Sequence, residues 1–296
     1  MIKTSEKIVF FGSGPVATAS LDYISNFFEI EAVITKTNPT HHKHTAPVEE
    51  FAKKNKNEIF FVNNKNELDD LVQEKNFKSK IGIIVDFGII VSQKTIDSFP
   101  LGIINSHFSL LPQWRGADPI TFSILSGQEK TGVSIMLIEP ELDTGKLIKQ
   151  KSLHIDSKET IISLTNKLIN LSNELLVEYL PKYLNGEVKP RQQPHPNRAT
   201  YSRKLTKDDG IIDWKKPADL LEREIRAYIG WPKSRANLLG VEIIITSSHV
   251  TENPEDKLDV LCGDKKYLSI DELIAPSGRK MQALDFINGY LANKNI

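Results

Sequence analysis

The first two-thirds of the chain alternate short apolar runs with segments of helical periodicity. The runs are rich in β-branched residues and are too short for helices, whereas the segments between them repeat apolar residues every three or four positions. Strands separated by helices in this way favour a doubly wound, mainly parallel sheet, an α/β fold. We predict strands at 8–12, 30–35, near 59, 81–87 and 102–104, and helices that begin near 17, 48, 67 and 93.

A change in composition near residue 187 separates two predicted domains. The segment before it, 160–184, repeats apolar residues at helical spacing, so we expect a long helix over one face of the sheet. Residues 187–204 are rich in Pro, Gln, Asn and Arg without an apolar period, which is typical of an extended connector. The short apolar runs of residues 205–296 predict a smaller β-rich domain, with an OB-like barrel as the leading candidate among β modules. The first domain is then expected to cover residues 1–186.

The composition is that of a globular protein. Of its 296 residues, 40% are hydrophobic and 26% are charged, which allows ordinary apolar cores. No apolar stretch approaches the roughly 18 to 20 residues of a membrane-spanning helix, and the amino terminus shows no signal-peptide pattern. We therefore expect a cytoplasmic protein. The single cysteine, Cys262, excludes an internal disulfide and a cysteine-based zinc site, and a buried thiol is the preferred interpretation.

The balanced net charge conceals an asymmetry along the chain. Residues 182–240 contain 13 Lys and Arg against 7 Asp and Glu, whereas residues 241–296 contain 6 against 9. A basic segment is compatible with a polyanionic partner such as RNA. Composition alone favours a solvated connector and helix face over RNA binding.

Two motifs have a structural explanation that competes with a functional one. GSGPVA at 12–17 matches a dinucleotide-binding fingerprint, but Thr35, Lys36 and Thr37 stand where a ribose-binding carboxylate is expected. A tight strand-to-helix turn with Pro15 at the helix start is therefore preferred.

The second motif is a run of basic residues in a polar loop, His41, His42, Lys43 and His44. Clustered imidazoles can bind zinc, but this loop has no nearby carboxylate or cysteine, so we predict no metal site. Solvent exposure, or a loop that becomes cationic near a polyanion, fits better.

The strongest functional signal lies at the end of the predicted strand at 102–104. Asn105 and His107 are two residues apart, so on a strand their side chains point to the same face. At the carboxyl end of a parallel strand that face opens onto the crevice where α/β proteins bind ligands. Asp143, in the Gly-bounded turn LDTG, adds a carboxylate. An amide, an imidazole and a carboxylate together predict an active site.

The sequence around these residues resembles a known family. INSHFSLLPQWRGADPI, LSGQEKTGVSIM and ELDTG are similar to the core of the folate-dependent formyltransferases. TYSRKLTKDDGIIDW, IRAYIGWP and GRKMQALDFINGYL resemble the carboxyl-terminal domain of the members that act on methionyl-tRNA. The resemblance implies a Rossmann-like formyltransferase domain, 10-formyltetrahydrofolate as formyl donor, no metal, and formyl transfer to the amino group of initiator methionyl-tRNA.

Carried over residue by residue, the resemblance assigns Asn105, His107 and Asp143 to catalysis. It assigns Ser109, Leu110, Leu111 and Pro112 to the folate site. Formyl transfer to an amine passes through a tetrahedral intermediate with an oxyanion, to which Asn105 and protonated His107 can donate hydrogen bonds. Asp143 can orient His107 and stabilise its protonated form. It can also assist removal of the amine proton. Three apolar residues after the strand at 81–87 are candidates for a wall of the pterin slot, with core packing as the alternative: Phe87, Ile89 and Ile90.

For the tRNA side, we expect the basic residues of the connector to follow the acceptor-stem backbone and the His-rich loop, His41 to His44, to approach the acceptor end. The connector residues are Arg191, Arg198, Arg203 and Lys204. The loop is shorter and less basic than its family equivalent, and Phe108 stands where the family usually has Gly. We expect a monomer.

Two alternatives stay open. A sugar-nucleotide N-formyltransferase would use the same catalytic residues on a different amine. A non-catalytic RNA-binding relative would keep the fold, although it would not need Asn105, His107 and Asp143 together.

Overall fold

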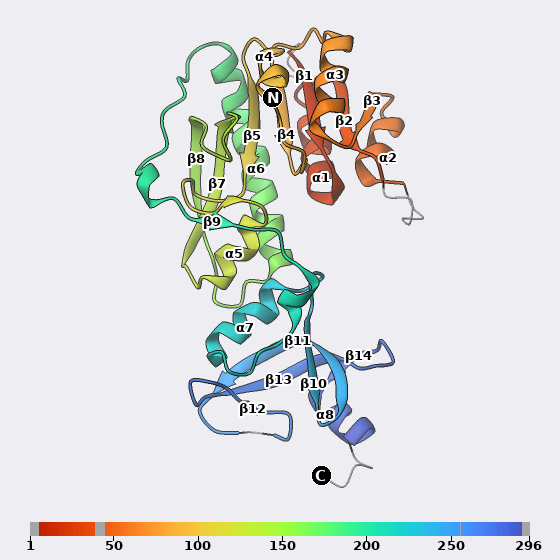
Figure 1. Ribbon diagram of the computed structural model, residues 1–296, viewed down its shortest axis with the longest axis vertical. Helices are drawn as coiled ribbons and strands as arrows, with labels where there is room; N and C mark the ends of the chain where they lie inside the picture. Colours follow the sequence, from red (N-terminus) through yellow and green to blue (C-terminus); the bar gives the residue numbers. More distant parts are fainter. Residues whose placement is uncertain (1–5, 39–44, 255, 292–296) are drawn as a thin grey trace. The chain divides into compact units, whose positions relative to one another are not determined.

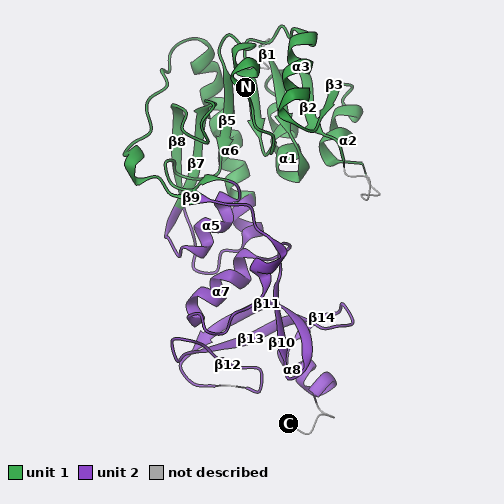
Figure 2. Cartoon of the chain, viewed as in Figure 1, with its two compact units in different colours: residues 1–116, 131–153, 166–201 green, residues 117–130, 154–165, 202–296 purple. Residues whose placement is uncertain are grey.

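The computed structural model describes residues 6–38, 45–254 and 256–291 (Figure 1). These residues form two compact units (Figure 2). The first unit comprises residues 1–116, 131–153 and 166–201, and the second comprises 117–130, 154–165 and 202–296. Two short segments before residue 166 thus belong to the second unit. The boundaries expected from the sequence at 186 and 204 stay a prediction.

The first unit is built on a seven-stranded sheet with the order β3-β2-β1-β4-β5-β7-β8. The pairs β1–β2, β2–β3, β1–β4 and β4–β5 are parallel, and β5–β7 is antiparallel. The predicted mainly parallel sheet is therefore confirmed. The strands are β1 (Lys7–Gly12), β2 (Glu29–Lys36), β3 (Glu58–Val62), β4 (Gly82–Val85), β5 (Ile103–His107), β7 (Lys130–Leu137) and β8 (Leu147–His154).

Helices cover both faces of this sheet (Figure 1). Val9 and Phe11 of β1 belong to one apolar cluster with Leu68 and Val72 of α3. On the opposite face, Ser106 of β5 shares a 2.6 Å hydrogen bond with Ser172 of α6. The helices are α1 (Gly14–Ile24), α2 (Pro47–Lys54), α3 (Lys65–Lys75), α4 (Gln93–Asp97) and α6 (Ile161–Leu184). Among the described residues, no helix is both long and apolar enough to cross a bilayer.

The segment after β5 and the end of the connector pair in a small two-stranded sheet. Its strands are β6 (Arg115–Gly116), after β5, and β9 (Tyr201–Ser202), at the end of the connector. The connector is therefore paired to the chain that follows β5, although its sequence has no strand pattern.

The second unit has a curled antiparallel sheet, as expected of an OB-like half-barrel. Its strand order is β10-β11-β13-β12, and β14 also pairs with β13. Leu221 and Ile225 of α7 pack into one core with Ile243, Leu268 and Phe286. The predicted Rossmann-like domain and smaller β domain are thus confirmed. The elements are α5 (Pro119–Leu125), α7 (Ala218–Ala227), β10 (Ser234–Leu238), β11 (Val241–Thr251), β12 (Val260–Leu261), β13 (Tyr267–Ile274), β14 (Lys280–Gln282) and α8 (Ala283–Phe286).

Candidate active site

Strand β5 places two polar side chains on one face of the sheet. Ile103 packs in the cluster that α3 covers, and Ser106 points to the opposite face, toward α6. Asn105 and His107 share the parity of Ile103, so they face the side opposite Ser106. Asn105 is half-buried, and its side-chain amide makes no hydrogen bond to any described residue. That amide is therefore available to a ligand at the carboxyl end of β5.

His107 is buried, and each of its ring nitrogens faces a polar group. Its Nε2 lies 2.8 Å from the backbone oxygen of Trp114. A carbonyl oxygen only accepts hydrogen bonds, so Nε2 carries a proton. Nδ1 lies 3.7 Å from Oδ2 of Asp143, which is an ion-pair distance and too long for a direct hydrogen bond. When Nδ1 is also protonated, Asp143 stabilises the imidazolium.

Asp143 lies in a tight turn between β7 and β8. Its φ of 51° is in the left-handed region. Its Oδ2 accepts a 2.7 Å hydrogen bond from the backbone N–H of Gly116. Gly145 closes the turn, because a Cβ there would lie 1.8 Å from the backbone oxygen of Leu137. The structure thus brings Asp143 of the β7–β8 turn to His107, which shares one face of β5 with Asn105.

The segment predicted to contact folate, Ser109 to Pro112, is held by hydrogen bonds from Ser134 of β7. Ser134 is fully buried; its hydroxyl donates to the Ser109 oxygen at 2.6 Å and accepts from the Leu111 N–H at 3.1 Å. The side-chain amide of Gln150 donates to the Leu111 oxygen at 3.0 Å. Leu110 is half-buried, and the Leu111–Pro112 peptide bond is cis. The backbone polar groups of Leu111 are thus satisfied by protein.

The three apolar residues expected in the pterin wall differ in burial. Phe87 is buried, and its ring meets Phe11 edge-on with centroids 5.7 Å apart. Ile89 is half-buried, whereas Ile90 is 75% exposed. Ile90 is therefore the member of this set with the most surface open to a ligand. Phe108, the departure from the family pattern, is 8% exposed and forms part of the buried interior.

The backbone of the GSGPVA turn packs closely against neighbouring protein atoms. A Cβ on Gly12 would lie 2.6 Å from the Ala17 side chain and 2.8 Å from the Val85 oxygen. The Ser13 hydroxyl accepts from the Lys36 N–H at 3.2 Å and lies 3.3 Å from the Thr35 hydroxyl. Helix α1 begins at Gly14 with a proline in its first turn. This geometry agrees with the preferred interpretation, a tight strand-to-helix turn.

Residues His41, His42, Lys43 and His44 lie outside the described part of the chain. Within the described part, no group of three or more His, Cys, Asp or Glu side chains gathers as metal ligands would.

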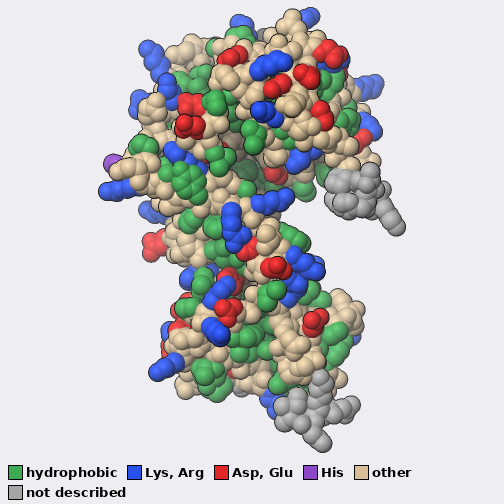
Figure 3. Space-filling model, in the orientation of Figure 1, with side chains coloured by type: hydrophobic (Ala, Val, Ile, Leu, Met, Phe, Trp, Pro, Cys, Tyr) green, Lys and Arg blue, Asp and Glu red, His purple; other side chains and the backbone are tan. Residues whose placement is uncertain are grey.

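The basic residues of the connector differ in their surroundings. Arg203 pairs with Asp209 through two hydrogen bonds, of 2.9 and 2.5 Å, so its charge is already compensated. Arg191 and Arg198 are exposed, and so is Lys204; none forms an ion pair within the residues that the structure describes. The visible face of the molecule likewise shows Lys and Arg interspersed with Asp and Glu (Figure 3).

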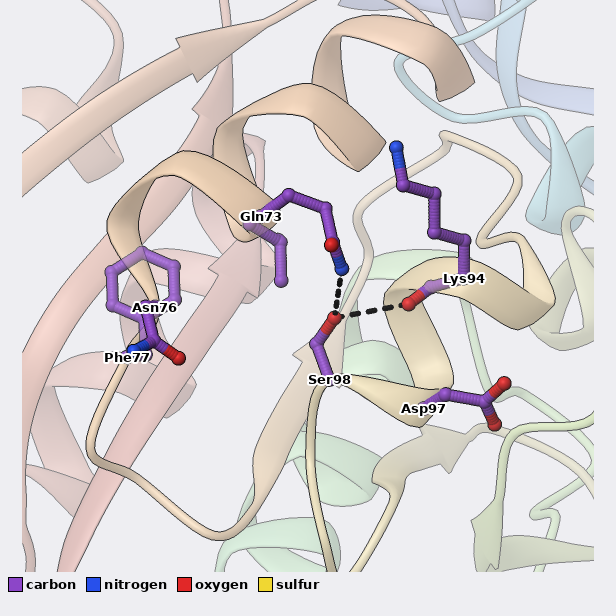
Figure 4. A pocket seen from close by; sticks show the side chains of 7 residues that line it. Gln73, Asn76, Phe77, Lys94, Asp97 and Ser98 are labelled. Carbon is purple, nitrogen blue, oxygen red and sulfur yellow. Dashed lines mark hydrogen bonds between the residues drawn. The ribbon is translucent and has the colours of Figure 1, made fainter.

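A separate hollow lies between α3 and α4 (Figure 4). Gln73 donates to the Ser98 hydroxyl at 3.0 Å across it, and Lys94 and Asp97 are at its rim. Helix α4 leads into the amino end of β5, so this hollow lies near the amino ends of the parallel strands. His107 is at the carboxyl end of β5, away from the hollow.

Sequence reasoning did not find two buried polar residues beside the Asp143 turn, Arg115 and Gln193. Arg115 is 6% exposed and Gln193 is 5% exposed. A guanidinium N–H of Arg115 donates to the side-chain oxygen of Gln193 at 2.7 Å. Arg115 lies in the motif LLPQWRG, but Gln193 lies in a polar connector where no pattern indicates burial.

The chain is similar to known proteins over both of its domains. Residues 6–180 match the formyl transferase family model, and residues 204–291 match the formyl transferase C-terminal domain. A methionyl-tRNA formyltransferase from Coxiella burnetii is 33% identical over 304 aligned positions, 97% of this chain and 96% of that protein. One from Methylococcus capsulatus is 36% identical over 230 residues, 72% of this chain and 73% of that protein.

Among solved structures, an N-formyltransferase from Helicobacter canadensis in complex with folinic acid and dTDP-3-aminofucose is similar with a TM-score of 0.70. It is 20% identical and covers 90% of this chain and 99% of its own, so the likeness shows the fold. The similarity to the curated relatives extends over both domains. The chain therefore belongs to the formyl transferase family and groups within it with the methionyl-tRNA formyltransferases.

Proposed function

We propose that this protein transfers a formyl group from 10-formyltetrahydrofolate to the free amino group of initiator methionyl-tRNA. The observation that carries the proposal is His107 facing the Asp143 carboxylate at 3.7 Å, with the unpartnered amide of Asn105 on the same face of β5. Formyl transfer needs a donor for the developing oxyanion and an acceptor for the amine proton. These residue types supply both.

We assign Asn105 to stabilisation of the formyl oxygen as negative charge develops on it. Its amide gives up no protein hydrogen bond to do so, so its N–H donors are free for the developing oxyanion. His107 supplies positive charge beside the same face when both ring nitrogens are protonated.

Asp143 has a carboxylate oxygen left for the proton. Oδ2 accepts from Gly116 and faces His107, whereas Oδ1 makes no hydrogen bond to a described residue. The Asp143 side chain is 13% exposed, so Oδ1 can accept the amine proton directly or through one water molecule.

The residues present fit a folate. A pterin needs an apolar wall with a few fixed polar groups, and Ile90 offers an exposed apolar side chain after β4. Ser109, Leu110, Leu111 and Pro112 form a segment fixed by Ser134 and Gln150, so they present a rigid edge. When bound, the folate would supply the activated formyl group and leave as tetrahydrofolate, with the proton lost by the amine passing to its N10.

For the tRNA, we propose that Arg191, Arg198 and Lys204 contact backbone phosphates, because their charges are not used within the described protein. Arg203 contributes less, since Asp209 neutralises it. The loop from His41 to His44 is proposed to approach the acceptor end.

The rival function is formylation of an amino sugar on a nucleotide. Sugar N-formyltransferases share the fold at 20% identity, whereas the methionyl-tRNA formyltransferases match at 33% over nearly the whole chain. A non-catalytic RNA-binding role leaves the Asn105 amide and the paired His107 unexplained. The tRNA substrate is therefore preferred.

The test is a choice between substrates. The protein is incubated with 10-formyltetrahydrofolate and either charged initiator tRNA or amino-sugar nucleotides. Formyl-methionyl-tRNA is the expected product. Formylation of the sugars alone would reject the proposal, and no formylation of either would favour the binding protein.

We further propose a monomeric, cytoplasmic enzyme with a catalytic domain at 1–186, a connector at 187–204 and a tRNA-binding domain at 205–296. Size-exclusion chromatography with light scattering tests the first point, and a stable dimer would contradict it.

A further inference from the structure

The connector is hydrogen-bonded at two points to segments next to the candidate site, one at Arg191 and one at Thr200. At one end, Arg191 exchanges two backbone hydrogen bonds with Leu147, of 2.7 and 2.9 Å. At the other end, the Thr200 hydroxyl accepts from the Trp114 N–H at 2.9 Å, and the Thr200 oxygen accepts from the Arg115 N–H at 2.9 Å. Trp114 is the residue whose carbonyl accepts from His107. The segment between Arg191 and Thr200 therefore has a fixed path beside the site.

Gln193 uses this fixed path to reach the Asp143 turn. Its amide nitrogen donates to the backbone oxygen of Asp143 at 2.7 Å and to that of Gly145 at 3.0 Å. Arg115 fixes which way the amide points, because a guanidinium only donates and must meet the amide oxygen. The NH₂ group is then left facing two carbonyls that only accept. One buried side chain thus satisfies two carbonyls of the turn, those of Asp143 and Gly145.

The turn needs such support. Asp143 has a left-handed φ of 51°, a conformation that Asp tolerates better than most L residues but that still costs energy relative to the right-handed region. The carboxylate must also stay near His107 and Gly116, at 3.7 and 2.7 Å from Oδ2. Without the two bonds from Gln193, the carbonyls of Asp143 and Gly145 would be free to rotate toward water.

We infer that Gln193 is a positioning residue for formyl transfer: it holds the turn that aims the Asp143 carboxylate at His107. The connector is then part of the catalytic apparatus and not only a tether between domains. The expected kinetic effect rests on the proposed function, whereas the hydrogen-exchange test below does not.

The variant Gln193→Met keeps the length of the side chain and removes its hydrogen bonds. Turnover of methionyl-tRNA should fall about 10- to 100-fold in kcat, with the KM for tRNA within about twofold, because a displaced catalytic group lowers the rate without removing substrate contacts. Gln193→Asn, which is one methylene shorter, should show the same split if the methionine variant folds poorly. The neighbouring exposed residue provides the matched control: Gln192→Met should leave kcat unchanged.

Hydrogen exchange provides a readout that does not depend on activity. The Gly116 amide reports its bond to Asp143, and it should exchange about tenfold faster in Gln193→Met. Amides of β1 and β4 should keep their wild-type exchange rates, which shows that the sheet is intact. Unchanged exchange at Gly116 would overturn the inference, whatever the activity. A loss confined to KM for tRNA would also overturn it.

Discussion

The substitution Gly145→Ala tests whether the active-site turn tolerates any movement. The backbone angle at Gly145 is one that alanine can adopt, so the obstacle is space alone. The added methyl would lie 1.8 Å from the Leu137 oxygen, which is 1.6 Å short of ordinary contact at 3.4 Å (3.4 minus 1.8). The two segments are joined there by a 2.9 Å backbone bond from Leu137 to Lys146, so this contact cannot open without loss of that bond. The turn must therefore shift by about 1 Å or more, and Asp143 must shift with it.

A shift of this size should lower kcat about 100-fold. It should also lower the free energy of unfolding by about 1 to 3 kcal/mol, the usual cost of overpacking. Initial rates of formyl-methionyl-tRNA formation at saturating substrates measure the first effect, and thermal unfolding measures the second. Gly289→Ala is the control, because a methyl there meets nothing within 4 Å. A folded Gly145→Ala protein with wild-type kcat would refute the reasoning.

Three further predictions concern other parts of the molecule. Ser134→Ala removes the buried hydroxyl that holds Leu111, so the KM for the formyl donor should rise and stability should fall by about 1 to 3 kcal/mol; an unchanged KM would contradict this role. Hydrogen bonds from Arg203 hold the pKa of Asp209 well below its ordinary value, so the stability that Asp209 contributes is complete above about pH 4 and is lost as the pH falls further. Asp209→Asn should therefore lower the melting temperature at pH 7, with a cost of about 1 kcal/mol that shrinks by pH 3; equal losses at both values would contradict the assignment. Arg198→Ala should weaken tRNA binding and reduce its salt dependence, whereas Arg203→Ala should change the salt dependence less; the reverse order would show that the Arg203–Asp209 pair opens on binding.

The sequence predicted those parts of the fold that repeat. Apolar runs and helical periods follow directly from burial, so the parallel sheet and the shared face of Asn105 and His107 could be anticipated. The antiparallel direction of β7 could not be anticipated. Parallel and antiparallel strands show the same alternation of side chains in the sequence.

The contacts of the connector also could not be predicted from the sequence pattern. Gln193 is buried by tertiary contacts with Arg115 and the Asp143 turn, and local composition carries no signal for such contacts. Arg203 was expected to meet phosphate, but its pairing with Asp209 depends on how the chain turns after residue 204. Phe87 follows a buried strand, and only the structure shows that its ring packs against Phe11.

The central claim is that Asn105 donates to the formyl oxygen during transfer to methionyl-tRNA. Single-turnover formylation by Asn105→Ala, with enzyme saturated by both substrates, tests it most directly. The rate should fall about 10² to 10³-fold while the dissociation constants for donor and tRNA and the melting temperature stay close to wild type, because the amide makes no hydrogen bond to the described protein. A single-turnover rate within about threefold of wild type would contradict the account, since removal of one oxyanion donor costs far more than that.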